Sequence, residues 1–115
     1  MKSDQEYTTA KRASIHDTVM PLLKSMYIEF KELSKKKPDA AVSKSKISIA
    51  NRLLLKVREV LEDEASVEFL DLLDEDDIPQ TSDVTLILSQ YVAAMNGFKQ
   101  KFHGWNGGDH DWFTE

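Results

Sequence analysis

The chain has 115 residues, a net charge of −5 and no cysteine. This length predicts one domain with one modest hydrophobic core. The lack of cysteine excludes disulfides, thiolate chemistry and Cys-ligated zinc, and it is compatible with the reducing cytoplasm, where we expect the protein to act. No apolar stretch approaches the roughly 18 residues of a transmembrane helix, and residues 1–10 lack the apolar region of a secretory signal.

Charge is distributed unevenly along the chain. Residues 1–58 carry 13 Lys/Arg and 6 Asp/Glu, and residues 59–115 carry 2 and 14, so the two parts have net charges of +7 and −12. In a bundle these charges can complement each other within the molecule. Alternatively, they can present two opposed fields to charged partners.

The first amphipathic segment lies before Pro38. Its apolar residues recur at steps of three and four, which indicates one face of a helix. We expect a helix from about residue 5 to Lys36, kinked at Pro21 because proline lacks the amide donor. We expect His16 at its surface or at the boundary of the core. The predicted core stripe comprises Ile15, Val19, Leu22, Met26, Phe30 and Leu33.

Two further helices follow the same periodicity. The second is expected to begin at a cap formed by Asp39 or Ser43 and to end near Glu64, with a short helix capped by Ser66 after it. Its predicted core residues are Ile47, Ala50, Leu54, Val57 and Leu61. The third is expected to begin with a cap at Thr81 or Ser82. Its predicted core residues are Val84, Leu88, Tyr91, Met95, Phe98 and Phe102.

Glycines in and after the third helix have specific predicted roles. Gly97 is expected to allow close approach of a neighbouring helix, and Gly104 to form a left-handed C-terminal cap. No strand is predicted. The fold class is therefore all-α, an antiparallel helical bundle of three long helices plus one short helix over residues 1–104, followed by an aromatic tail over 105–115.

The last residues read HGWNGGDHDWFTE and contain both aromatic and metal-binding side chains. Three glycines oppose the ordered geometry that a metal site needs, so no metal or other cofactor is predicted. Large aromatic side chains are costly to leave in water. We therefore expect Trp105, Trp112 and Phe113 to pack on the bundle or on a partner.

A run of carboxylates without an intervening Lys or Arg covers residues 62–77. Together with the aromatic tail it is the predicted surface of a non-enzymatic regulatory module, for example an inhibitor that neutralises a basic protein. The predicted partner-binding residues are Glu68, Asp71, Asp74, Glu75, Asp76, Asp77, Trp105, Trp112 and Phe113. A three-helix bundle often leaves an apolar face open, which makes a homodimer a further expectation.

An enzymatic alternative rests on EVLE (59–62) and EFLD (68–71). Carboxylates three residues apart share a helix face, and this pattern resembles the paired carboxylates of helical Mg²⁺-dependent nucleotide pyrophosphohydrolases. The resemblance implies a metal site formed by Glu59, Glu62, Glu68 and Asp71. Those enzymes separate the pairs by a longer stretch, whereas five residues lie between Glu62 and Glu68 here.

A second alternative is nucleic-acid binding through a lysine cluster. Lysines bind phosphates without sequence preference and with strong salt dependence. The cluster lies around Pro38 and comprises Lys35, Lys36, Lys37, Lys44 and Lys46. It contains no arginine and no interleaved aromatic residue, and the chain as a whole is acidic. Nucleic acid is therefore a less favoured partner than protein.

Overall fold

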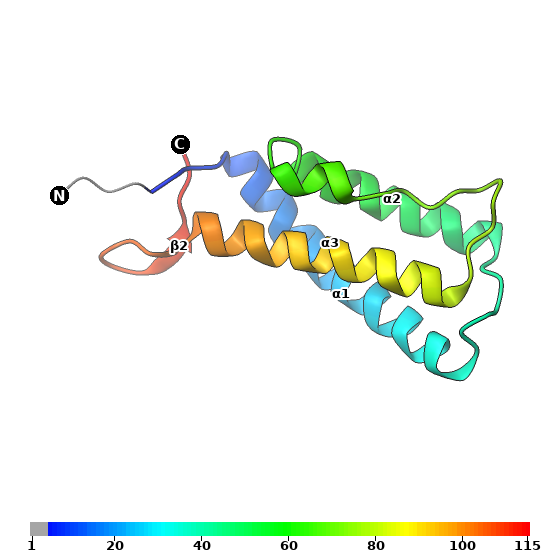
Figure 1. Cartoon of the computed structure of the whole chain (residues 1–115). Helices are drawn as coiled ribbons and strands as arrows, with labels where there is room; N and C mark the ends of the chain where they lie inside the picture. The colour runs from blue at the N-terminus through cyan, green and yellow to red at the C-terminus, as the bar shows by residue number, and fades with distance from the viewer. Residues whose placement is uncertain (1–4) are drawn as a thin grey trace.

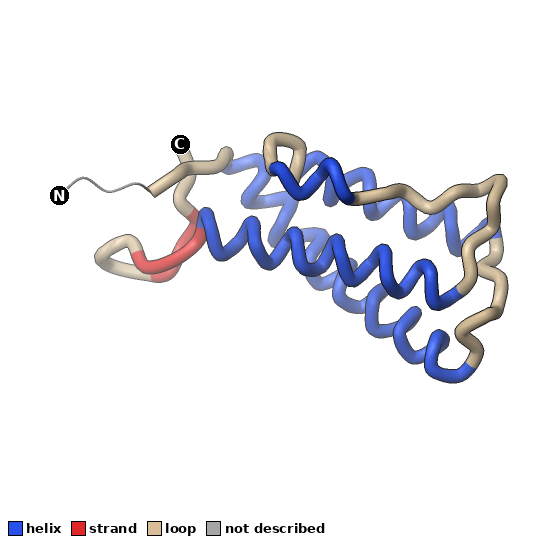
Figure 2. The backbone as a smooth tube through the Cα atoms, in the orientation of Figure 1, coloured by secondary structure: helices blue, strands red, loops and turns tan. Residues whose placement is uncertain are grey.

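The structure, a computed structural model, describes residues 5–115. These residues form three α-helices followed by a small hairpin (Figures 1 and 2). A long connection joins the second helix to the third. The elements are α1 (Ala10–Lys36), α2 (Lys44–Val60), the 3₁₀ helix η1 (Ala65–Phe69), α3 (Thr81–Phe102), β1 (His103–Trp105) and β2 (His110–Trp112). The predicted helical bundle is confirmed in outline. The expected short fourth helix is a 3₁₀ helix of five residues, and the hairpin was not predicted.

The helix directions differ from the predicted antiparallel order. Ala41 and Gln80, which precede α2 and α3, pair in an isolated β-bridge, so both helices begin at the same end of the molecule. At the other end, Nζ of Lys101 in α3 lies 3.3 Å from Oε1 of Glu64, just beyond α2. Thus α2 and α3 are parallel to each other and antiparallel to α1. The connection between them must return along the length of the bundle (Figure 1).

Residues 70–80 form the returning part of this connection, which we call the crossover segment. Few direct contacts join α2 to α3, and Leu70 and Leu73 of the crossover segment belong to the core beside both helices. Side chains of the helices bind its main chain: the Arg58 guanidinium donates to the Leu70 carbonyl, and the Tyr91 hydroxyl donates to the Asp71 carbonyl at 3.0 Å. The segment is therefore a packed part of the fold.

Helix α1 is continuous through Pro21 and begins at Ala10, later than predicted, because Thr9 caps it by accepting from the Arg12 amide at 3.1 Å. Its buried face is rotated from the predicted stripe. The helix packs against both α2 and α3, and its buried residues are Ala13, His16, Val19, Met20, Leu23 and Phe30. Leu22 and Leu33, both predicted to be core, have exposed fractions of 56% and 38%.

The predicted stripes of α2 and α3 are confirmed, since every residue of both is buried. Ser43 caps α2, as one of the two alternatives predicted, by accepting from the Lys46 amide. Helix α2 ends at Val60, earlier than expected. Helix α3 is capped by Gln80 in a reciprocal arrangement with Asp83, not by Thr81 or Ser82. The Thr81 hydroxyl instead donates to the carbonyls of residues 37 and 38, and no Ser66 side-chain cap is formed at η1.

The hairpin continues directly from α3 and is anchored to the beginning of the chain. His103 is paired with Trp112, and Trp105 with His110. Beyond β2, the Thr8 amide donates to the Phe113 carbonyl at 2.9 Å, and the Glu115 amide donates to the Thr8 carbonyl at 3.0 Å. The left-handed glycine is Gly107, with a φ of 99°, and Gly104 lies in β1, so its predicted capping role is wrong.

Candidate protein-binding surface

The crossover segment and the end of η1 carry a set of exposed carboxylates, which we call the acidic set. It comprises Glu68, Asp71, Asp74, Glu75, Asp76 and Asp77. None of these six takes part in an ion pair within residues 5–115; the acids that do are Glu6, Glu32, Glu59, Glu62, Asp63 and Glu64. Among the described residues, the carboxylates of the acidic set therefore face solvent without an ion-pair partner.

One member of the acidic set also shapes the backbone. Oδ1 of Asp74 accepts from the amides of Asp76 and Asp77 at 2.8 and 3.1 Å. These hydrogen bonds hold the pKa of Asp74 below its usual value because they stabilise the ionised carboxylate. Asp74 thus stays charged while it orders the turn that presents Glu75, Asp76 and Asp77.

An exposed aromatic side chain adjoins the acidic set. Phe69, at the end of η1, is 72% exposed, and it borders a groove of about 580 Å³ between η1 and α3. Ala93, Ala94 and Gly97 contribute small residues to this groove. Nothing lies within 4 Å of a Cβ built on Gly97, so the predicted close helix approach there is wrong. An accessible aromatic beside a shallow apolar groove is typical of an interface anchor.

The tail aromatics are divided between the fold and the surface. Trp112 is half-buried: its ring lies 5.0 Å from that of His16, and its Nε1 donates to Oδ2 of Asp17 at 3.0 Å. Phe113 packs edge-on against Tyr7 and covers Gly104. Trp105, in contrast, is 60% exposed. Of the three tail aromatics, Trp105 is therefore the most accessible to a partner.

His16 is a core residue, and its predicted surface or boundary position is wrong. The side chain is 2% exposed, Nε2 lies 2.9 Å from the Met95 carbonyl oxygen, and the ring stacks on Phe98. Because a carbonyl only accepts, Nε2 carries the proton of this neutral imidazole. Burial lowers the pKa of His16 by disfavouring the charged form. The sequence signal was available, since residues 13, 16, 20 and 23 also follow helical spacing.

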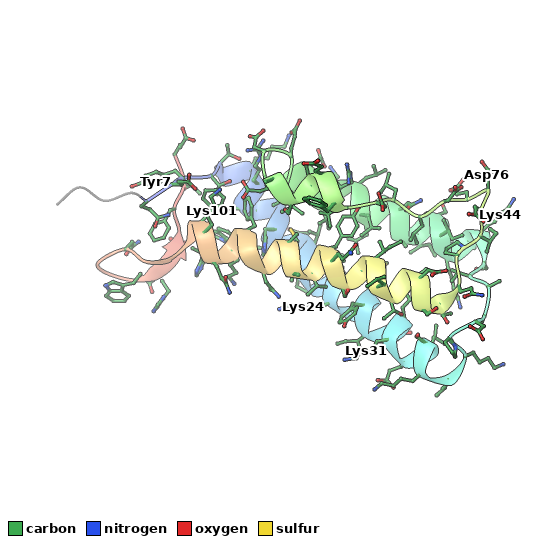
Figure 3. All side chains as sticks on the ribbon, in the orientation of Figure 1. Tyr7, Lys24, Lys31, Lys44, Asp76 and Lys101 are labelled. Atoms are coloured by element: carbon green, nitrogen blue, oxygen red, sulfur yellow. The ribbon has the colours of Figure 1, made fainter. Side chains whose placement is uncertain are left out.

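The two parts of the predicted contact surface are not brought together. Asp74 to Asp77 lie before the beginning of α3, and Trp105 lies just beyond its end. A helix of this length spans about 33 Å, and Figure 3 shows Asp76 at the opposite end of the molecule from Tyr7 and Lys101. Asp74 to Asp77 and Trp105 therefore lie on two separate surfaces, at opposite ends of α3.

The four carboxylates of the metal-site alternative have other surroundings. Oε2 of Glu59 lies 2.9 Å from Nζ of Lys56, whose hydrogen bond lowers the pKa of Glu59. Glu62 lies beside Arg12, which also binds Asp63 at 2.7 Å. Within residues 5–115, no group of three or more His, Cys, Asp or Glu side chains is placed to share a metal ion.

The lysine cluster lies at the end of the bundle where α1 meets α2. Lys35 is paired with Glu32 at 3.2 Å, and Figure 3 shows Lys44 and Asp76 at the same end of the molecule. The bridge between Ala41 and Gln80 joins the two connections there. A phosphate backbone approaching these lysines would thus also meet the carboxylates of the acidic set, which repel it.

No protein-family model, curated protein or solved structure matches the chain. None of the helices in residues 5–115 is long and apolar enough to cross a membrane. Function is therefore inferred from the surfaces themselves.

Proposed function

We propose that the chain is a non-catalytic regulatory module of the cytoplasm that binds a basic protein partner through its acidic set and masks the partner's basic surface. One observation carries this proposal. Six exposed carboxylates, none of them ion-paired, lie on or next to a segment whose backbone is held by Arg58, Tyr91 and Asn51.

The attachment of the crossover segment favours binding. Its main chain is already ordered, so a partner gains contacts without the entropic cost of ordering a loop. The helices bind main-chain atoms of Leu70, Asp71 and Leu73. The neighbouring carboxylates Glu75 and Asp77 are consequently not needed for these attachments. The clustered negative charge of the acidic set accelerates association with a basic surface and disfavours association with acidic proteins.

Phe69 supplies an apolar contact beside these charges. Charged rims give association rate and specificity, whereas buried aromatic anchors give most of the affinity of a protein interface. Phe69 and its groove lie beside α3, next to the acidic set. Trp105 lies at the opposite end of α3 from Asp76. We propose it as a second anchor for a partner that extends along the 54 Å length of the molecule.

The test is affinity capture from the source organism with three forms of the full chain. The first is the wild type, and the second carries Asp71→Asn, Glu75→Gln and Asp77→Asn. The third is a control with the same change in net charge, Glu32→Gln, Asp39→Asn and Glu115→Gln. We expect the wild type and the control to recover the same basic protein, and the acidic-set variant to lose it.

Direct titration of the recovered protein then completes the test. Affinity should fall by at least about tenfold in the acidic-set variant and fall further as salt is added. Equal capture by all three forms, or recovery of an acidic partner through the acidic set, contradicts the proposal. Circular dichroism of each form confirms that the substitutions leave the helices intact.

A further inference from the structure

An apolar groove lies between α1 and α2, away from both surfaces described above. It has a volume of about 520 Å³ and is lined by residues of α1 and α2 alone. Leu22 on α1 is 56% exposed and Ile49 on α2 is 51% exposed. Met26 and Leu53, both half-buried, complete its apolar floor. We call it the α1–α2 groove.

The groove exists because the apolar sector of α1 is wider than its two neighbours cover. Met20 and Leu23 are buried in the core, whereas Leu22 and Met26 continue the apolar surface beyond it. Successive helix residues are separated by about 100°, so these positions occupy roughly half of the helix circumference. An apolar stripe of this width is typical of a helix with a third packing partner.

Charges on the two rims of the α1–α2 groove are opposite. Glu29 lies on the α1 rim, and Arg52 lies on the α2 rim. Neither forms an ion pair within residues 5–115, and Lys56, the other cation of the groove, already binds Glu59. A two-fold rotation places the α1 rim of one copy against the α2 rim of another. The rim that carries Glu29 then faces the rim that carries Arg52 on both sides of the two-fold axis, which makes the surface self-complementary.

We propose that a second copy of the chain covers the α1–α2 groove, with α1 of each copy packed on α2 of the other. The result is a four-helix interface with Leu22 and Ile49 at its centre. Helix α2 has 17 residues, which span about 25 Å, and two packed helices are about 20 Å wide. This face offers on the order of 500 Å² per copy, enough to approach the lower limit of roughly 1,000 Å² for a specific interface.

The dimer leaves the proposed partner surface accessible. The crossover segment binds to Asn51, Arg58 and Tyr91, none of which lines the α1–α2 groove. Failure of dimerisation and failure of partner binding are consequently distinguishable: a monomeric variant that still captures the basic partner separates the two.

Charge exchange tests the proposed pairing. Sedimentation equilibrium should show a dimer for the wild type, and a weakened dimer for Glu29→Arg and for Arg52→Glu, because each variant opposes like charges twice. An equimolar mixture of these two variants restores both attractive pairs, so we expect a heterodimer with at least about tenfold higher affinity than either homodimer.

A pair of apolar substitutions supplies the matched control. Leu22→Glu in the groove should dissociate the dimer, whereas Leu86→Glu, at a site on α3 that is 61% exposed, should leave it intact. Circular dichroism establishes that each variant is folded. A wild type that is monomeric at submillimolar concentration overturns the proposal. So does dimerisation unaffected by Leu22→Glu, or a mixture that gains no affinity over its components.

Discussion

Asn51 and Leu73 are joined by two reciprocal hydrogen bonds. Nδ2 of Asn51 donates to the Leu73 carbonyl and the Leu73 amide donates to Oδ1 of Asn51, both at 2.8 Å. The side-chain amide thus satisfies both polar groups of one extended residue, as a neighbouring strand would. Leu73 can consequently be buried against α2 without leaving an unpaired amide or carbonyl.

Replacing Asn51 by alanine should loosen the crossover segment. Two hydrogen bonds are lost and the main-chain groups of Leu73 are left without protein partners, so the free energy of unfolding should fall by about 1–3 kcal/mol. Urea denaturation measures this change. Gln100→Ala, an exposed substitution on α3, serves as the control and should alter stability by less than about 0.5 kcal/mol. Equal effects of the two substitutions would show that the attachment contributes little.

The two tryptophans of the hairpin should differ in their contribution to stability. Trp112 packs on His16 and Phe98 and donates to Asp17, so Trp112→Ala should cost about 2 kcal/mol. Trp105 is largely exposed, and Trp105→Ala should change stability by less than about 0.5 kcal/mol. Thermal melting followed by circular dichroism compares them. A reversed order would mean that the hairpin packs differently.

His16 should make stability depend on pH. The imidazole titrates at 6.5 when unperturbed, and burial lowers its pKa in the folded chain. Asp17 opposes this shift, and Lys24 and Lys99 favour it. Between the folded pKa and 6.5 the unfolded chain binds more protons. The free energy of unfolding therefore keeps the full contribution of neutral His16 above pH 6.5. It loses this contribution as the pH falls from 6.5 through the lowered pKa of the folded chain.

The variant His16→Gln isolates this contribution. Glutamine retains an amide donor for the Met95 carbonyl but does not titrate. The variant should therefore be less stable than the wild type near neutral pH, and its free energy of unfolding should fall less as the pH is lowered. Urea unfolding at about pH 7.5 and about pH 5 gives the comparison. Parallel pH profiles of the wild type and the variant would assign the acid sensitivity to other groups.

Much of the helical framework is predictable from the sequence because burial repeats at helical spacing. The stripes of α2 and α3 are assigned without error, from Ile47 to Leu61 and from Val84 to Phe102. On α1 the same reasoning selects Leu22 and Leu33, which are exposed, and passes over Ala13 and Met20, which are buried. The apolar sector of α1 lines both the core and the α1–α2 groove, so it contains more than one stripe at helical spacing. Periodicity alone does not show which of these stripes is buried.

Other features depend on contacts between distant residues. Nothing near residues 70–80 indicates that Asn51 and Tyr91 bind that segment, so the parallel arrangement of α2 and α3 was not predictable from local patterns. The acidic set was identified correctly as an exposed feature, but its separation from Trp105 follows from the helix direction. A short helix capped by Ser66 was expected where the chain forms a five-residue 3₁₀ helix, which leaves Phe69 exposed.

Magnesium should not stabilise the chain. Glu59 and Glu62 are next to Lys56 and Arg12, and a cation would have to displace these partners before binding. Thermal melting with and without millimolar Mg²⁺, in the presence and absence of a nucleotide, should give the same midpoint. A rise in the midpoint that Glu59→Gln abolishes would instead support the metal-dependent alternative.

The central claim is that the acidic set is the docking surface for basic proteins, and amide chemical-shift mapping tests it most directly. We would titrate the isotope-labelled chain with a short peptide of alternating arginine and alanine at low salt. The largest saturable changes should fall within residues 68–77 and diminish in the Asp71→Asn, Glu75→Gln, Asp77→Asn variant. They should persist in the Glu32→Gln, Asp39→Asn, Glu115→Gln control. Changes centred elsewhere, or lost equally from both variants, would contradict the claim.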